Sequence, residues 1–282
     1  MAEPLHIACL QTRPQPDFDA ALDEALTLAE EAVADGARFL FLPEYCGGLR
    51  SEGVALVPPA AAEEEHPVLG GLRAFARERQ VWILVGSLAI AAPGDKILNR
   101  SYVVDDGGEI RESYDKIHLF DIQLGPDEVY RESEYVLPGN RAVTVETPLG
   151  LLGLTICYDL RFPCLFRDLA LAGAEVITVP AAFTRRTGEA HWHALNRARA
   201  IENGAWIVAP CAIGAVEGGG ESYGHSLVVD PWGVIVADGG AGPGVVHARI
   251  DPAAARSARA RIPSLEHGRT YQRPAQRHPS AA

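Results

Sequence analysis

Short apolar runs alternate with amphipathic segments from the beginning of the chain. The run at 5–10 predicts a buried strand, and a helix is predicted between Asp17, a good N-cap residue, and Gly36, which suits the position after a helix end. Its apolar positions recur at helical spacing, and they are Leu22, Leu26, Ala29 and Val33. A second apolar run at 38–43 leads directly into Glu44. The chain therefore opens with a predicted β-α-β unit that places an acid at the carboxyl end of a strand.

The alternation continues to about residue 250. We predict helices at 67–80 and 188–203, and a third that begins near Pro163, since proline suits the first turn of a helix. The predicted strands lie at 81–90, 98–105, 151–156, 174–180, 205–210, 225–230, 233–238 and 245–250. Residues 58–65 and 117–140 are predicted to be loops. Strands that alternate with helices favour a layered α/β fold.

No repeat and no Pro/Gly/Ser-rich linker divides the chain. We therefore predict one domain over 1–270, followed by a mobile tail at 271–282 that is rich in Pro, Arg and Gln.

Composition and charge narrow the class of partner. The 282 residues include 25 basic and 37 acidic side chains, with a formal net charge of −12, which argues against a nucleic-acid or anionic-membrane surface. No run approaches the ~18–20 apolar residues of a membrane span, and the first residues lack a signal-peptide pattern. Five cysteines without a C-x-x-C pair are typical of reduced thiols. We expect a cytoplasmic protein.

Cys157 is the strongest candidate nucleophile. It ends an apolar strand and begins a polar turn before the helix at Pro163, where backbone N–H groups favour a thiolate and an oxyanion. A buried cysteine that only packs would have the same sequence context, so position alone leaves both interpretations open. Packing is the interpretation we favour for the other four, Cys9, Cys46, Cys164 and Cys211.

A nucleophilic thiol needs a base. One possibility is His118 or His225, although neither has an obvious orienting partner in the sequence. The other is Glu44 together with Lys116, because the chain has only two lysines and Lys116 lies outside the turn-rich segments. A buried Glu beside a Lys ammonium and a thiol could accept and return a proton.

Other chemistries have little support. The chain has no P-loop and no complete G-x-G-x-x-G, and Ser226 follows half of a nucleophile elbow without its closing glycine. His191 and His193 are two apart in a predicted helix and face different directions, so they cannot chelate a metal together. We expect no metal site.

Three segments together resemble the signature segments of the nitrilase superfamily of carbon–nitrogen hydrolases. They are Phe41–Glu44 (FLPE), Tyr114–Phe120 (YDKIHLF) and Cys157–Pro163 (CYDLRFP). The similarity extends over about 5–270 and includes Tyr130–Ser133, Pro138–Gly139, Ala182–Thr184, Thr187–Trp192, Ser222–Ser226 and Asp230–Gly233.

The resemblance implies an α-β-β-α sandwich that forms homodimers and needs no cofactor. It also implies a triad with Glu44 as base, Lys116 stabilising the tetrahedral intermediate and Cys157 as nucleophile. Glu132 matches an additional site glutamate that orients the lysine or the substrate, and the backbone N–H of Tyr158 would complete the oxyanion hole. A thioester would form with release of ammonia, and water would then release the acid.

Within the superfamily, the segments at 223–233, 248–251 and 261–263 are most similar to the Nit branch. Its members hydrolyse the amide of deaminated glutathione or the ω-amide of 2-oxoglutaramate-type acids, and the first substrate is the closer match. Such substrates carry carboxylates, which makes Arg161 a candidate clamp; the alternative is a structural pair with Asp159 or a nearby acid. Thr187 is a candidate polar contact, and Phe183 and Thr184 are candidate pocket residues.

Three alternatives stay open at this stage. The chain could be an N-carbamoyl amino-acid or aliphatic amidase of the same superfamily, or a catalytically silent binding protein on the same fold. A redox-sensing thiol protein would need a reversible disulfide, for which Cys157 and Cys164 are the candidate pair.

Overall fold

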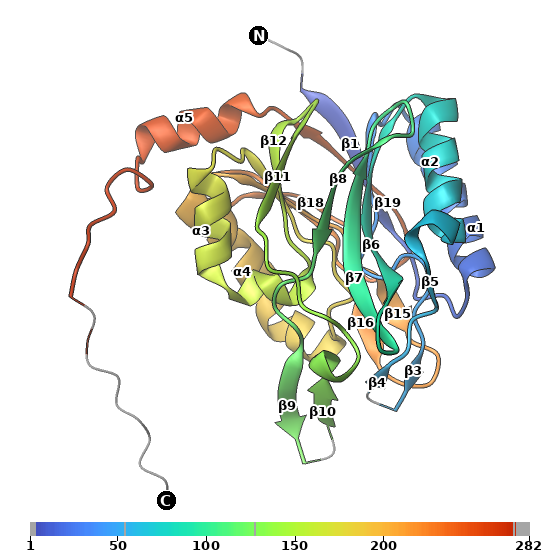
Figure 1. Cartoon of the computed structure of the whole chain (residues 1–282). Helices are drawn as coiled ribbons and strands as arrows, with labels where there is room; N and C mark the ends of the chain where they lie inside the picture. Colours follow the sequence, from blue (N-terminus) through green and yellow to red (C-terminus); the bar gives the residue numbers. More distant parts are fainter. Residues whose placement is uncertain (1–3, 54, 127, 273, 275–282) are drawn as a thin grey trace, which may run out of the picture.

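Two large β-sheets lie face to face in the computed structural model, with helices covering both outer faces (Figure 1). The structure describes residues 4–53, 55–126, 128–272 and 274. This arrangement is the α-β-β-α sandwich that the resemblance implied. Most of the predicted tail at 271–282 lies outside the described residues.

The first sheet contains β1 (Leu5–Gln11), β2 (Phe39–Phe41), β5 (Ala60–Ala61), β6 (Trp82–Ala92), β7 (Lys96–Val104), β8 (Ile110–Asp115) and β19 (Gly244–Ile250). The second sheet contains β11 (Val143–Thr147), β12 (Gly150–Leu154), β13 (Val176–Thr178), β14 (Trp206–Ala209), β17 (Leu227–Val229) and β18 (Ile235–Asp238). Three small two-stranded sheets are formed by β3 (Ser51–Glu52) with β4 (Ala55–Leu56), β9 (Asp121–Gly125) with β10 (Glu128–Arg131), and β15 (Ile213–Ala215) with β16 (Glu221–Tyr223). The small sheets gather at one end of the sandwich (Figure 1).

The first sheet has the strand order β19-β1-β2-β6-β7-β8, with β5 beside β6, and the second has the order β11-β12-β13-β14-β17-β18. The neighbours β1, β2 and β6 are parallel, as are β12, β13 and β14. Parallel neighbours need crossover helices, and these cover the outer faces. They are α1 (Phe18–Ala34) and α2 (Pro67–Arg79) on the first sheet, and α3 (Pro163–Leu171) and α4 (Arg185–Asn203) on the second. The last helix is α5 (Ala253–Arg261).

The central strands β1 and β2 of the first sheet are apolar on both faces because each face is covered. In β1, Ile7 and Cys9 pack between the sheets, whereas Ala8 and Leu10 pack beneath the helices. A strand buried on both sides reads as a continuous apolar run, which is why 5–10 and 38–43 stand out in the sequence.

The cap prediction for α1 is correct in detail. The Asp17 carboxylate accepts a 2.9 Å hydrogen bond from the Ala20 N–H, and Gly36 has φ +93°. The predicted buried face is only partly right, since the most deeply buried positions are alanines, namely Ala21, Ala25, Ala29 and Ala32. Small side chains allow the helix to lie close to the sheet.

The prediction of a loop at 117–140 is wrong. This segment contains β9, β10 and a 3-10 turn at Glu132–Glu134, and it is not one long loop. Its strands form an isolated hairpin whose side chains are half-buried or exposed, so no apolar run marks them. The strands β3, β4, β5, β8, β11, β15 and β16 and the helix α5 were missed as well, and β5 lies within the predicted loop at 58–65.

No helix among the described residues is long and apolar enough to cross a membrane.

Candidate active site

Three strand ends bring the predicted catalytic residues to the same edge. Glu44 follows β2, Lys116 follows β8 directly, and Cys157 follows β12. In the first sheet, β8 is antiparallel to β7, and β7 is antiparallel to β6, so β8 runs in the same direction as β2. Carboxyl ends of strands with one direction meet at one edge of a sheet, and the facing sheet contributes Cys157 at that edge.

Lys116 is the centre of the site. Its Nζ lies 2.8 Å from Glu44 Oε1 and 2.9 and 3.0 Å from the two carboxylate oxygens of Glu132. All three side chains are buried, with at most 4% of each exposed. Burying charged groups is costly unless they are paired, and here one ammonium serves two carboxylates.

The two carboxylates are held in place by further donors. Glu44 accepts a 2.9 Å hydrogen bond from Asn99 Nδ2 at Oε1 and one of the same length from the Ala182 N–H at Oε2. Glu132 Oε2 accepts a 2.6 Å bond from the Phe120 N–H. These donors fix the orientation of both acids, and Asn99 was not identified from the sequence. The signal available in the sequence was a polar asparagine inside the strand predicted at 98–105.

Cys157 lies in a strained turn. Its φ is +48°, which is unfavourable for a residue with a Cβ, and its N–H donates a 2.9 Å bond to the Pro180 carbonyl. It begins a 3-10 turn at Cys157–Arg161. Among the described residues, the N–H of Tyr158 has no hydrogen-bond acceptor. A free N–H next to the thiol fits the predicted oxyanion hole.

The ionisation states follow from burial and neighbouring charges. Burial raises the pKa of Glu44, but the charge and hydrogen bond of Lys116 outweigh it, so the pKa is lowered overall. Burial lowers the pKa of Lys116, but Glu132 and Glu44 raise it well above its usual value. Burial and the charge of Glu44 raise the pKa of the Cys157 thiol. These directions favour an ionised Glu44 and Lys116 beside a neutral thiol, a state in which attack by the sulfur needs proton transfer to Glu44.

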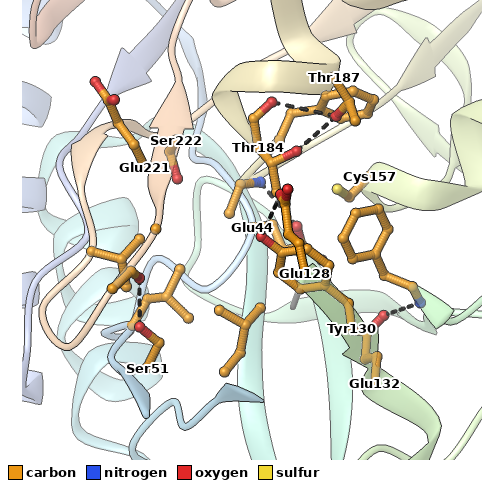
Figure 2. A pocket seen from close by; sticks show the side chains of 18 of the residues that line it. Glu44, Ser51, Glu128, Tyr130, Glu132, Cys157, Thr184, Thr187, Glu221 and Ser222 are labelled. Carbon is orange, nitrogen blue, oxygen red and sulfur yellow. Dashed lines mark hydrogen bonds between the residues drawn. The ribbon is translucent and has the colours of Figure 1, made fainter. Parts of the chain in front are cut away.

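A cavity of about 220 Å³ opens onto these residues. Its walls come from the segments that follow strands of both sheets, from the small hairpins and from the start of α4. In Figure 2, Ser51, Glu221 and Ser222 lie on one side, and Cys157, Tyr130 and Glu132 lie on the other. Part of the segment 46–66, which lies between β2 and α2, therefore covers the site through Leu49, Ser51, Gly53 and Leu56.

The candidate substrate contacts differ in position. Phe183, Thr184 and Thr187 line the cavity, and the two threonine Oγ1 atoms lie 2.7 Å apart. Arg161 does not line it. Its guanidinium lies over the ring of Phe183 at 5.4 Å and over the ring of Tyr158 at 5.8 Å, one side chain away from the cavity.

The alternative interpretation of Arg161 was an ion pair with Asp159, but the Asp159 carboxylate binds other groups. Asp159 accepts hydrogen bonds from Tyr114 Oη and from the Ile156 N–H, and it binds both the backbone and the ring of His118. The Arg161 guanidinium lies 3.3 Å from His191 Nδ1, and no carboxylate of the described residues forms an ion pair with it. As a substrate clamp, Arg161 stays a prediction.

The structure gives both His118 and His225 an orienting partner that was not obvious in the sequence. His118 Nδ1 lies 2.7 Å from Asp159, and His225 Nδ1 lies 2.8 Å from Asp238. Neither histidine lines the cavity of Cys157. Both partners are distant in the sequence and could not be found by spacing.

The chain belongs to the carbon–nitrogen hydrolase family, whose model matches residues 6–260. It is 38% identical over 269 residues to the deaminated glutathione amidase of Synechocystis sp. (strain PCC 6803 / GT-S). The alignment covers 94% of this chain and 98% of that protein.

Two solved structures extend the comparison. Saccharomyces cerevisiae Nit3, a member of branch 10 of the nitrilase superfamily, superposes with a TM-score of 0.81 at 31% identity, covering 93% of this chain and 96% of Nit3. A glutamate-to-glutamine mutant of the amidase from Nesterenkonia sp. AN1 superposes with a TM-score of 0.78 at 27% identity, covering 95% and 94% of the two chains. That structure shows covalent addition of the acetamide moiety of fluoroacetamide at its active-site cysteine. The resemblance to the nitrilase superfamily and its Nit branch is confirmed.

Proposed function

We propose that this chain hydrolyses the C–N bond of a small carboxylated amide through a Cys157 thioester, with a substrate similar to deaminated glutathione. The observation that carries the proposal is the buried Glu44–Lys116–Glu132 cluster at the wall of the cavity that also contains Cys157. The similarity to deaminated glutathione amidases supports the choice of substrate.

The charges assign a role to each group. Two carboxylates and one ammonium leave a net negative charge beside the thiol, so Cys157 does not ionise in advance. Its proton passes to Glu44 as the sulfur attacks the carbonyl carbon. The oxygen becomes an oxyanion, which the Lys116 ammonium and the Tyr158 N–H stabilise. Glu132 keeps the ammonium in position.

The same carboxyl group then completes the cycle. Glu44 donates its proton to the leaving nitrogen, the C–N bond breaks, and ammonia leaves behind a thioester. Glu44 next takes a proton from water as the water oxygen attacks the thioester. The C–S bond breaks, the acid leaves, and the proton on Glu44 returns to the sulfur. No cofactor takes part in this cycle.

The substrate's carboxylate needs a cation other than Lys116, which already serves two acids. Arg161 is the proposed clamp, because its guanidinium lies over the ring of Phe183, a cavity residue, and carries no ion pair among the described residues. Thr184 and Thr187 are the proposed polar contacts. A homodimer and a cytoplasmic location also remain predictions.

Ammonia release from a substrate panel tests the proposal. The panel contains deaminated glutathione, 2-oxoglutaramate, an N-carbamoyl amino acid and a simple aliphatic amide. We expect fastest turnover of deaminated glutathione, at least a 10³-fold loss in Cys157→Ser, and no loss in Cys164→Ser, which changes an exposed thiol outside the cavity. Turnover of the carbamoyl compound alone would favour the other amidase branch, and no turnover of any compound would favour a binding protein.

Labelling of the thiol separates the role of Glu44 from substrate choice. Iodoacetamide with intact-mass analysis should modify Cys157 in the wild type. Glu44→Gln should react faster at pH 7, because the charge that raises the pKa of the thiol is lost, but it should turn over amides more slowly, because the acceptor of the thiol proton is lost. Wild-type turnover of amides in Glu44→Gln would remove Glu44 as the base. A reversible disulfide between Cys157 and Cys164 under mild oxidant would instead favour redox sensing.

A further inference from the structure

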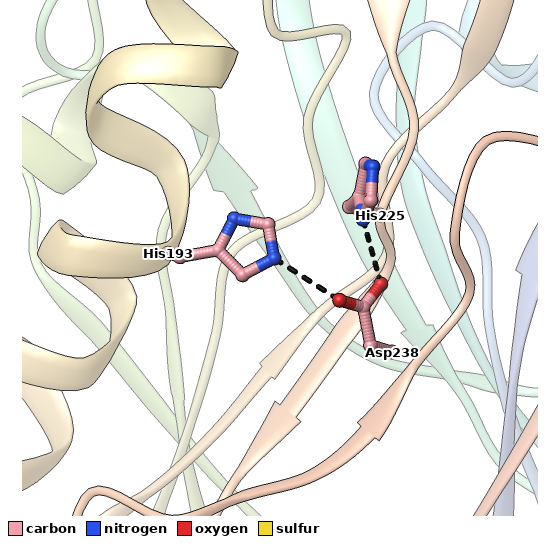
Figure 3. A group of neighbouring side chains, drawn as sticks. All are labelled: His193, His225 and Asp238. Carbon is pink, nitrogen blue, oxygen red and sulfur yellow. Dashed lines mark hydrogen bonds and ion pairs between the residues drawn. The ribbon is translucent and has the colours of Figure 1, made fainter.

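A second group of chemically capable side chains lies away from the cavity. His193 belongs to α4, His225 follows β16, and Asp238 ends β18. The Asp238 carboxylate lies between the two imidazoles, with Oδ2 3.1 Å from His193 Nε2 and Oδ1 2.8 Å from His225 Nδ1 (Figure 3). None of the three lines the cavity of Cys157.

Hydrogen bonds around the group hold its three elements together. The His225 N–H donates to the Gly240 carbonyl, and the Gly240 N–H donates to Asp238 Oδ1, both at 2.9 Å. Trp192, the neighbour of His193 in α4, donates from Nε1 to the His225 carbonyl at 2.8 Å. Such outer contacts orient metal ligands in known sites.

Each imidazole of the group faces Asp238 with one of its two ring nitrogens. Within the described part of the chain, His193 Nδ1 and His225 Nε2 have no hydrogen-bond partner. Each ring can therefore move its proton to that free nitrogen and present a lone pair where it now faces Asp238.

We propose that His193, His225 and Asp238 bind one divalent transition-metal ion of the zinc type. Their ligand atoms lie within 4.8 Å of one another, and small side-chain rotations bring them to the ~2.0–2.2 Å bond lengths of zinc. Two imidazoles and one carboxylate suit zinc better than magnesium or calcium, which prefer oxygen ligands. The group is partly exposed to solvent, so water completes the coordination.

The bound ion would connect three elements near the active site without joining the reaction. It would connect α4 to the β17–β18 hairpin and to the segment that follows β16. The first turn of α4 places Thr187 in the cavity, and β16 itself contributes Ser222 to the cavity. Because the three ligands do not touch the cavity, this proposal does not depend on the proposed amidase activity.

Metal titration of the tag-free full-length protein tests the site. Isothermal titration with Zn²⁺ should give one equivalent per chain, and Co²⁺ should give the visible spectrum of nitrogen and oxygen ligation without a sulfur-to-metal band. His193→Ala, His225→Ala and Asp238→Asn should each weaken Zn²⁺ binding at least tenfold. Circular dichroism of each variant checks that it is folded.

The chain offers a matched control. His247 Nδ1 lies 3.0 Å from His6 Nε2, and its other ring nitrogen lies 3.4 Å from Asp35, so His247→Ala removes a similar histidine from a different group. This variant should bind Zn²⁺ as the wild type does. Zn²⁺ should also raise the Tm of the wild type and of His247→Ala but not of His193→Ala. Equal binding by all variants, binding through a thiol, or no binding would overturn the proposal.

Discussion

Tyr114 donates a 2.7 Å hydrogen bond from its hydroxyl to the carboxylate of Asp159, and both side chains are buried. Tyr114 precedes Lys116 by two residues, and Asp159 follows Cys157 by two. The same carboxylate accepts bonds from the Ile156 and His118 backbones. Asp159 thus connects the segment that carries Lys116 to the segment that carries Cys157 across the two sheets.

Removing this connection should lower turnover as well as stability. Tyr114→Phe loses a buried hydrogen bond to a charged acceptor, worth about 1–3 kcal/mol of unfolding free energy. Asp159→Asn should cost more, because an amide cannot accept from all of these donors. We expect both variants to lower kcat, measured as ammonia release, together with the midpoint of urea unfolding.

Tyr102→Phe is the control for this prediction. The Tyr102 hydroxyl lies 3.0 Å from Glu63, and the side chain packs under the helices of the first sheet, on the side away from the second. Loss of the Tyr102 hydroxyl should lower the free energy of unfolding without lowering kcat. A normal kcat in folded Asp159→Asn would show that Asp159 only stabilises the fold.

The sequence predicts the strand ends that carry Glu44 and Cys157 because the strands before them are buried on both faces and read as apolar runs. It does not predict β8, since Ile110–Asp115 mixes charged and apolar residues, although this strand places Lys116. The rarity of lysine pointed to Lys116 instead. Contacts such as Tyr114 with Asp159 join residues 45 apart, so no local pattern reveals them.

Gly86 should be essential for the position of Glu44. It lies at a register shift in β6, and a Cβ there would come within 2.0 Å of the Leu42 carbonyl oxygen and 2.3 Å of the Pro43 carbonyl oxygen. Gly86→Ala must therefore displace the two residues that precede Glu44. We expect a loss of about 1–3 kcal/mol in unfolding free energy and a lower kcat.

Gly70→Ala is the matched substitution, because nothing lies within 4 Å of its added Cβ in the exposed part of α2. It should raise the unfolding free energy by about 0.5–1 kcal/mol and leave kcat unchanged. Wild-type stability and turnover in Gly86→Ala would contradict the predicted clash.

Arg161→Ala should separate binding from chemistry. If Arg161 receives the substrate's carboxylate, its loss removes a charge-assisted bond worth about 1.5–3 kcal/mol and raises KM for deaminated glutathione at least tenfold. KM for a neutral aliphatic amide should change little. Arg141→Ala, which removes an exposed arginine that pairs with Glu112, should affect neither. Equal KM increases for charged and neutral amides would point to a structural role for Arg161.

His66 should make the fold sensitive to mild acid. The side chain is 2% exposed, neither ring nitrogen has a hydrogen-bond partner among the described residues, and burial lowers its pKa to about 4. An unfolded histidine has a pKa near ~6.5, so between these values the unfolded chain binds a proton that the folded chain does not. This contribution to stability is full above pH 6.5 and is lost as the pH falls towards 4, by up to about 3 kcal/mol.

His66→Leu replaces the ring with an apolar side chain that does not titrate. Its free energy of unfolding, measured with urea from pH 7 to pH 4, should fall less steeply than that of the wild type. The exposed His267→Gln should follow the wild type across the range. Parallel curves for wild type and His66→Leu would mean that the buried imidazole is protonated without unfolding, which requires a partner for its second N–H, such as a bound water. The difference between the two curves isolates His66, because the carboxylates that titrate in the same range are common to both proteins.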